Sequence, residues 1–358
     1  MNRKKYPNIK NNSFRVGAAV FLLILVMFGV IIAVASARSK PVEKVGTIIA
    51  DTSAATDGVG QASGEPASES ANTAAPVIAS PEITENSESF PAEWDAEYAI
   101  LLDTETNEIV RYKNHNIRMN PASLTKVMTL VVAVENIEDL SDTVLITADM
   151  VDPMYALDAS LAGFAVGETP TLEQVLYGVI LPSGADASLA AAAYTAGSEA
   201  AFVQLMNLKA EEMGLKNTYF TNVIGLYDKQ HYSTAEDMAV ILEYAIQNEF
   251  CRKVLSTYEY EIPPTQLNPE GIKLTSTVFS RMTGTEMPGV TIQGGKTGYT
   301  DEAGQCLETF AEINGKIYIM VLGGGTTKWN VIYDTLSGYS IYCAGGQAYI
   351  PPEIPAAE

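Results

Sequence analysis

Segments patterned as β-strands lie at both ends of residues 93–348, and segments patterned as helices lie between them. The first two strands are expected at Tyr98–Asp103 and Glu108–Tyr112. Later strands are expected at Ile292–Gly298, Gly304–Ile313 and Lys316–Leu322, the last two joined by the hairpin turn Asn314-Gly315. This segregation predicts an α+β fold, in which the two ends build one antiparallel sheet flanked by helices and a mostly helical subdomain is inserted.

The helices of the middle region have recognisable start signals. They are expected at Ser123–Ile137, Thr171–Leu181, Asp186–Ala196, Glu199–Met213 and from Ser233 to about Gln247. Pro121 is placed to start the first helix. Thr171 with Gln174, and Ser233 with Glu236, each fit a capping box, in which the two residues satisfy each other's free backbone N–H groups.

The N-terminal segment predicts export. Residues 1–15 are rich in Lys and Arg, and they precede the uncharged apolar run Val16–Ala37. This run is long enough to span a bilayer as a helix. The basic flank predicts a cytoplasmic N-terminus and an extracytoplasmic remainder. Ala35-Ser36-Ala37 also fits a signal-peptide cleavage site, but the run exceeds the usual apolar core of ~7–15 residues. We therefore expect a single-pass cell-membrane protein, or a secreted one if the chain is cleaved after Ala37.

Residues 38–92 are rich in Ser, Ala, Thr, Glu and Pro, a composition that predicts a disordered spacer. Residues 349–358 are expected to form a short tail. The net charge of −21 excludes non-specific nucleic-acid binding, which needs a basic surface.

The cysteine and histidine content narrows the chemistry. Cys251, Cys306 and Cys343 allow one disulfide and a leftover thiol, although each is equally readable as a small buried apolar residue. No Cys-x-x-Cys or His-Glu-x-x-His occurs, so no metal is expected. His115 and His231 are the only histidines and no Gly-x-Ser-x-Gly elbow occurs, so a histidine-based triad is not expected. We interpret His231 as a structural or exposed residue, because no motif places an acidic or serine partner beside it.

Three short motifs point to serine chemistry without histidine. Ser123-Leu-Thr-Lys126 places serine and lysine on one helix face, where the amine can reach and activate the hydroxyl. Ser183-Gly-Ala185 and Lys296-Thr-Gly298 follow in order. Each motif alone is weak, but together they match the three-part signature of penicillin-interacting serine enzymes.

Beyond these motifs, residues 93–346 resemble the D-alanyl-D-alanine carboxypeptidases, the low-molecular-weight penicillin-binding proteins. The stretches that carry the resemblance are Asn120–Lys126, Leu176–Asp186, Met213–Thr221, Tyr232–Asp237 and Gly294–Asp301. The resemblance implies a serine β-lactamase-like fold and a substrate that is a peptidoglycan stem peptide ending in D-Ala-D-Ala. It also implies covalent inhibition by β-lactam antibiotics and no cofactor.

The resemblance further implies a role for each motif residue. Ser123 would attack the carbonyl between the two D-alanines, with Lys126 as general base in its neutral form. Ser183 would relay a proton toward the leaving amine.

The strand Lys296-Thr297-Gly298 would pair with the substrate, and its lysine and threonine would face the terminal carboxylate. The backbone N–H groups of Ser123 and Tyr299 would form the oxyanion hole.

Two positions depart from the family. Ala185 stands where most members have an asparagine whose amide contacts the lysine and the substrate, which predicts a slower enzyme. On an ungapped match, Asn330 replaces a carboxylate-binding arginine, with Lys328 as a nearby substitute. The alternatives left open are a D,D-endopeptidase, a β-lactamase-like hydrolase, and a weakly active homologue that binds stem peptides.

Overall fold

The computed structural model describes residues 78–351. Strands from both ends of this region form one six-stranded sheet in the order β1-β3-β2-β8-β7-β6. Its strands are β1 (Glu88–Ser89), β2 (Tyr98–Asp103), β3 (Glu108–Lys113), β6 (Thr291–Thr300), β7 (Gly304–Ile313) and β8 (Lys316–Gly325). The N-terminal β2 pairs antiparallel with the C-terminal β8, which joins the two ends of the domain as the sequence predicts.

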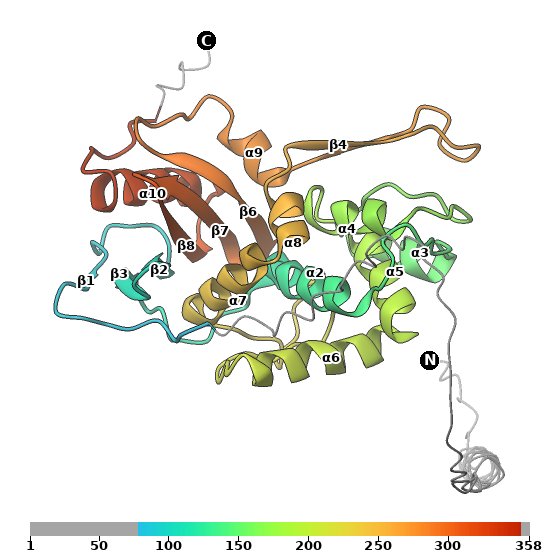
Figure 1. Cartoon of the computed structure of the whole chain (residues 1–358), viewed down its shortest axis with the longest axis horizontal. Helices are drawn as coiled ribbons and strands as arrows, with labels where there is room; N and C mark the ends of the chain where they lie inside the picture. The colour runs from blue at the N-terminus through green and yellow to red at the C-terminus, as the bar shows by residue number, and fades with distance from the viewer. Residues whose placement is uncertain (1–77, 352–358) are drawn as a thin grey trace, which may run out of the picture. The chain divides into compact units, whose positions relative to one another are not determined.

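Helices cover both faces of this sheet (Figure 1). They are η1 (Ala122–Leu124, a 3₁₀ turn), α2 (Thr125–Asn136), α3 (Ala148–Ala156), α4 (Leu172–Ile180), α5 (Ala185–Ala196), α6 (Glu199–Glu212), α7 (Ala235–Gln247), α8 (Glu249–Leu255), α9 (Thr277–Met282) and α10 (Lys328–Tyr342). Helix α10 packs on one face, and α2, α7 and α8 lie on the other, with α3–α6 forming a helical region beyond them. The α+β architecture with an inserted helical subdomain is confirmed.

The central strands are apolar on both sides because both faces are covered. In β2, Ile100 and Leu102 join the core beneath α2 and α7, whereas Leu101 joins the core beneath α10. All three side chains are fully buried. A strand buried on both faces reads as a continuous apolar run rather than as an alternating pattern, which is how this segment appears in the sequence.

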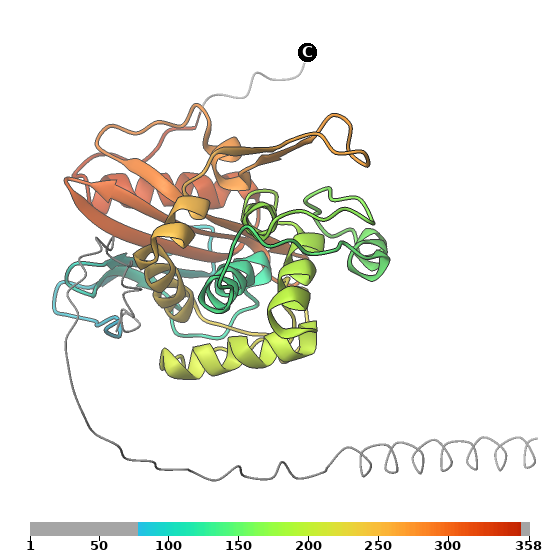
Figure 2. The ribbon, with the colours of Figure 1, turned by 45° about the vertical axis from the view of Figure 1, so that its right-hand side comes forward.

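A second sheet was not predicted. It consists of the hairpin β4 (Glu259–Ile262) and β5 (Ile272–Thr275), which extends from α9 over the helical region (Figure 2). The short β1 was also missed, and it pairs with β3 in parallel, so the main sheet is mixed and not wholly antiparallel.

The predicted turn and one of the two predicted capping boxes are present. Asn314 and Gly315 both have positive φ between the paired residues Ile313 and Lys316, which confirms the hairpin turn. The Thr171–Gln174 capping box is confirmed.

The second capping box, Ser233 with Glu236, is wrong by one residue, because Thr234 caps α7 and accepts a hydrogen bond from the backbone of Asp237. The Ser233 hydroxyl instead bonds to Thr218.

The expected domain start at residue 93 is too late. Residues 78–92 pack onto the sheet, where the backbone of Glu82 bonds to Asn107 and Ile109. Phe90 is buried against Trp94, with ring centroids 4.4 Å apart. At the other end, Tyr349 donates its N–H to Ser337, so the packed segment continues beyond 348. A few anchoring residues attach these segments to the domain. The average composition of a segment does not reveal such single residues.

The predicted membrane span 16–37, like most of the predicted spacer, lies outside the described residues. Within residues 78–351, no helix has the length and apolar character needed to cross a bilayer.

Candidate active site

The predicted nucleophile lies in a strained turn at the start of α2. Ser123 is half-buried in η1, directly after Ala122, which has a positive φ of 47°. The side chain of Asn120 holds this turn by accepting the Ala122 N–H at 2.9 Å. The predicted helix therefore starts with a 3₁₀ turn, and α2 proper begins at Thr125. The turn fixes the Ser123 hydroxyl above the first turn of α2.

Lys126 contacts the Ser123 hydroxyl as predicted. Its Nζ donates to Ser123 Oγ at 3.0 Å and to the Ile224 carbonyl at 2.7 Å. The side chain is 2% exposed. Burial is the main cause that lowers the pKa of Lys126 well below its ordinary value, and the charge of Lys296 lowers it further, against an opposing effect of Asp186. A neutral amine at this distance can accept the serine proton.

The loop that orients Lys126 was missed by the sequence analysis. The Asn222 side chain accepts hydrogen bonds from the backbone N–H groups of Ile224, Gly225 and Leu226, which turns the Ile224 carbonyl toward the lysine. Gly225 has a φ of 86°, and a Cβ there would lie 1.8 Å from the Ala122 carbonyl oxygen. The pattern Asn-x-x-Gly was the available signal, because asparagine closes such turns and glycine allows the close approach.

The second motif forms the entry to α5. Ser183 has a φ of 65° and is 6% exposed. Among the described residues, no hydrogen bond joins its hydroxyl to Lys126. Ala185 is buried, and its N–H donates to Ser160 at 2.8 Å. Its methyl group leaves the position without the amide of the family pattern.

Asp186 does not take over the role of the missing amide. Its carboxylate accepts the backbone N–H groups of Ala162 at 2.7 Å and Gly163 at 3.2 Å. It therefore fixes the loop before α4, although its charge still acts on Lys126.

The third motif lies on β6 beside Ser123. A Cβ on Gly298 would lie 3.1 Å from the Ser123 nitrogen, so a side chain here would crowd the turn that carries Ser123. The Thr297 hydroxyl bonds to that of Thr277 at 2.7 Å. Tyr299 follows with its side chain 55% exposed, and its phenol donates to Asp301. The arrangement supports a backbone role for Tyr299.

Lys296 is fully buried, and charged neighbours from two elements act on it. Its Nζ donates to the Thr297 carbonyl at 2.7 Å. Burial lowers the pKa of Lys296 to about 7, with Glu308 on β7 opposing the shift and Arg281 on α9 adding to it. Neither Glu308 nor Arg281 was singled out in the sequence, because neither belongs to a motif and only the fold brings them to Lys296.

Comparison with known proteins decides the family. The profile of the S11 peptidases, described as D-alanyl-D-alanine carboxypeptidase, matches residues 84–327. This chain belongs to that family. The match includes all three motifs and the strands β2 and β8, which join the two ends of the domain.

Individual relatives agree with the family assignment. The chain is 36% identical to the D-alanyl-D-alanine carboxypeptidase DacF of Bacillus subtilis over 237 residues, which cover 65% of this chain and 58% of the relative. It is 33% identical to DacA of Escherichia coli over 246 residues, covering 65% of this chain and 57% of that protein. The chain thus spans less than two thirds of the length of these relatives.

Solved structures give the same fold. A Streptomyces DD-transpeptidase superposes with a TM-score of 0.62 at 28% identity, covering 69% of this chain and 96% of the other. Penicillin-binding protein 5 of Haemophilus influenzae superposes with a TM-score of 0.61 at 29% identity, covering 70% and 72%.

Asn330 and Lys328, at the position where the family pattern has a carboxylate-binding arginine, make only local contacts. Asn330 donates its side-chain amide to Thr326 at 3.2 Å and its N–H to the α10 cap Thr327 at 3.1 Å. Lys328 lies over the Trp329 ring, 5.1 Å from its centroid. The contacts found for both side chains are thus within the start of α10.

His231 connects two segments next to Ser123. It is 2% exposed, its Nε2 lies 2.8 Å from Thr125 Oγ1, and its Nδ1 accepts the Thr221 N–H. Since Nδ1 accepts, Nε2 carries the proton in the neutral ring. Burial lowers the pKa of His231 to about 4. These contacts support the structural role predicted for it.

All three cysteines are free thiols, so the disulfide allowed by the sequence is not formed. Cys251 and Cys306 are buried, and burial raises the pKa of both to about 12. Within residues 78–351 no cluster of three or more His, Cys, Asp or Glu side chains is placed to hold a metal ion.

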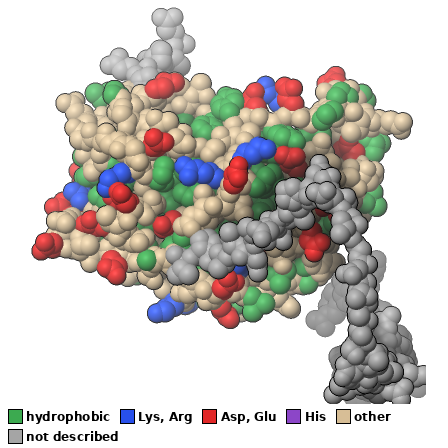
Figure 3. Space-filling model, in the orientation of Figure 1, with side chains coloured by type: hydrophobic (Ala, Val, Ile, Leu, Met, Phe, Trp, Pro, Cys, Tyr) green, Lys and Arg blue, Asp and Glu red, His purple; other side chains and the backbone are tan. Residues whose placement is uncertain are grey.

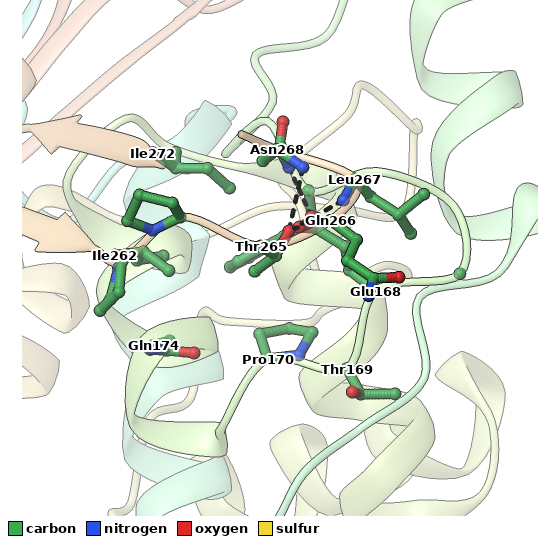
Figure 4. A pocket seen from close by; sticks show the side chains of 14 residues that line it. Glu168, Thr169, Pro170, Gln174, Ile262, Thr265, Gln266, Leu267, Asn268 and Ile272 are labelled. Carbon is green, nitrogen blue, oxygen red and sulfur yellow. Dashed lines mark hydrogen bonds between the residues drawn. The ribbon is translucent and has the colours of Figure 1, made fainter. Parts of the chain in front are cut away.

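A cavity of about 370 Å³ lies away from the motif residues, between the β4–β5 hairpin and the loop before α4 (Figure 4). Glu168 binds the hairpin tip there through hydrogen bonds to Thr265 and Asn268. A second cavity, of about 580 Å³, is lined by Asn120, His231 and other residues near the turn that carries Ser123.

On the face shown in Figure 3, acidic side chains are widely spread and basic ones lie among them.

Proposed function

We propose that this chain is a serine-type D-Ala-D-Ala carboxypeptidase that removes the terminal D-alanine from peptidoglycan stem peptides through an acyl-enzyme on Ser123. The observation that carries the proposal is the 3.0 Å contact between Ser123 Oγ and the buried Nζ of Lys126, within the fold of this family. Burial makes the amine a base, and the contact gives it a proton to accept.

In the first step, the Ser123 hydroxyl transfers its proton to Lys126 and attacks the carbonyl carbon of the penultimate D-alanine. The Ile224 carbonyl holds the amine in place through its second hydrogen bond. The N–H groups of Ser123 and Tyr299 stabilise the oxyanion, and the approach of Gly298 to the Ser123 nitrogen supports this pairing.

In the second step, the C–N bond breaks and D-alanine leaves with the proton that Lys126 took from Ser123. A relay by way of Ser183 requires its hydroxyl to turn toward Lys126 when substrate binds, since the two are not hydrogen-bonded in the described structure. Water then attacks the acyl-enzyme and gives its proton to Lys126, which restores the serine. No metal or cofactor takes part in these steps.

The substrate carboxylate is bound by Lys296 and Thr297, with Arg281 as the second cation. Arg281 acts electrostatically on Lys296 and makes no ion pair within the part of the chain that the structure describes. Lys328, the substitute that the sequence suggested, has its ammonium over Trp329 instead. We infer that Arg281 compensates for the arginine that Asn330 replaces.

The setting follows from the N-terminal sequence. Residues 16–37 would anchor the protein as a single membrane helix, with the catalytic domain outside the cytoplasm. β-Lactam antibiotics, which mimic D-Ala-D-Ala, would acylate Ser123 and inhibit the enzyme.

A related activity differs only in the acceptor of the acyl group. One structural relative is named a DD-transpeptidase. In a transpeptidase, an amine instead of water attacks the acyl-enzyme. The Ser123–Lys126 geometry serves both reactions, so product analysis must separate them.

The test is release of D-alanine from a D-Ala-D-Ala pentapeptide by the full-length chain in detergent. We expect release by the parent, loss of release in Ser123→Ala, and no change in Ser141→Ala, which alters an exposed serine elsewhere. Added glycine distinguishes transfer from hydrolysis, since a transpeptidase would form a glycine-terminated product. A folded parent protein that releases no D-alanine and forms no such product would overturn the proposal.

A further inference from the structure

Glu308 is a buried carboxylate with no role in the mechanism above. It lies in the middle of β7 and is 0% exposed. Among the described residues, neither of its oxygens has a hydrogen-bond partner. Burial raises the pKa of Glu308 well above its ordinary value, and the charge of Lys296 opposes this shift. The carboxylate can therefore be charged here only where the nearby lysine compensates it. Such an unsatisfied group therefore calls for a physical explanation.

The strand register places that opposite charge. Glu308 on β7 is directly opposite Lys296 on β6. Opposed residues of an antiparallel pair point to the same face, with Cβ atoms about 4.5–5.5 Å apart. Lys296 is also 0% exposed, and its amine donates to the Thr297 carbonyl at the end nearer the nucleophile. The two buried side chains thus lie on the same face of the sheet.

Apolar neighbours close the rest of the site. Cys306 and Phe310 flank Glu308 along β7 on the same face, and Val321 lies opposite it on β8. All three are buried. In this low-dielectric environment, the interaction between Glu308 and Lys296 is screened far less than a surface pair would be.

The other ionisable groups around the pair do not replace Glu308. Arg281 on α9 opposes protonation of Lys296, and so does burial. Lys126 on α2 has a strongly lowered pKa, an effect that Asp186 on α5 opposes. The remaining ionisable groups on elements packed against this face include Cys306 on β7, Glu243 on α7, and Glu249, Arg252 and Lys253 on α8.

We propose that Glu308 is a positioning residue that balances the charge of Lys296 from within the sheet and so keeps that lysine protonated to bind the substrate carboxylate. The proposal rests on the function proposed above. It has a second consequence, because the charge of Lys296 helps to keep Lys126 neutral. One buried carboxylate thereby supports both the binding cation and the neutral base.

The test is the pH profile of kcat/KM for D-alanine release, measured between pH 5 and 10 on the full-length chain. In Glu308→Gln the alkaline limb should move to lower pH by about one unit or more, which is about a tenfold loss at alkaline pH for each unit. Near pH 6 the loss should be much smaller. Glu308→Asp should retain most of the parent limb.

Controls separate charge from packing. Cys306→Ser alters a buried neighbour on the same strand face and should leave the alkaline limb in place. Glu308→Val repeats the test with a residue that suits a buried strand, in case glutamine prevents folding. An unmoved limb in a folded, active Glu308→Gln or Glu308→Val protein would overturn the proposal.

A binding measurement keeps this inference separate from the proposed activity. In a Ser123→Ala background, calorimetry with the same pentapeptide reports the charge of Lys296 without turnover. Affinity should fall at a lower pH when Glu308→Gln is added. If the parent shows no activity but this shift is present, only the proposed activity fails. If affinity has the same pH dependence with and without Glu308, this inference fails.

Discussion

Lys126 and His231 are two buried bases with different consequences. Burial lowers the pKa of both, but Lys126 contacts the Ser123 hydroxyl, whereas His231 bonds to Thr125 and a backbone N–H. The sequence predicted the contact between Lys126 and Ser123, because their spacing places both on one helix face. It could not show Glu308 or Arg281 near Lys296, because that proximity depends on strand register and on the placement of α9.

His231 should make folding stability sensitive to acid. Its pKa is about 4 in the folded protein and 6.5 ordinarily, so between these values the unfolded chain binds the proton and the folded one does not. The contribution of the buried neutral His231 to the free energy of unfolding is complete above pH 6.5. It decreases as the pH falls to 4, by roughly 3 kcal/mol in total. Urea unfolding should show the parent's advantage over His231→Gln shrinking across this window. A constant difference would contradict the assignment.

Ala185 should limit turnover. Restoring an amide with Ala185→Asn should raise kcat for D-alanine release, because one polar contact of this kind is commonly worth ~1–3 kcal/mol. The comparison is steady-state kinetics with a pentapeptide, with Ala185→Leu as a bulk control. Unchanged or lower turnover in the asparagine variant would mean that another group already fills the role.

At the scale of elements, the sequence predicted strands and helices well where pattern and turn chemistry agree. The hairpin at Asn314-Gly315 and the cap at Thr171 are examples. It failed where the signal was short or was placed one residue off: β1 has two residues, and α7 is capped by Thr234 and not by the predicted Ser233. The loop around Gly225 was missed because its role exists only through contact with the nucleophile turn.

Gly225 should be required for the active site. Gly225→Ala would place a Cβ 1.8 Å from the Ala122 carbonyl oxygen, so the loop or the nucleophile turn must move. Acylation by a penicillin should slow at least tenfold, with a clear loss of stability. Gly197→Ala is the matched control, since Gly197 also has positive φ but open space around its Cβ position. Equal effects of the two substitutions would show that backbone strain alone explains the loss.

At the scale of the whole molecule, strands from both ends of the domain form the sheet. One of them, β1, lies in the segment that composition assigned to a spacer. Phe90 packs against Trp94 and Tyr342, which connects the N-terminal segment to α10. The order of strand-like and helix-like segments predicted the class of fold. Composition predicted the spacer that precedes it. It could not locate the boundary, which depends on one aromatic residue and a few backbone hydrogen bonds.

Truncation should therefore distinguish the two boundaries. A chain that starts at residue 78 should be more stable than one that starts at residue 93, because the second lacks β1 and Phe90. Loss of one buried phenylalanine side chain commonly costs ~3–5 kcal/mol. Phe90→Ala in the longer chain should reproduce much of the difference in urea unfolding. Equal stability of the two truncated chains would show that residues 78–92 add nothing to the fold.

The measurement closest to the central claim is the site of acylation by a penicillin. The full-length chain is incubated with benzylpenicillin, and the adduct is located by mass spectrometry of the intact protein and of its peptides. We expect one adduct, on Ser123, absent in Ser123→Ala and formed much more slowly in Lys126→Gln. An adduct on another residue, or undiminished labelling of Ser123→Ala, would contradict the account.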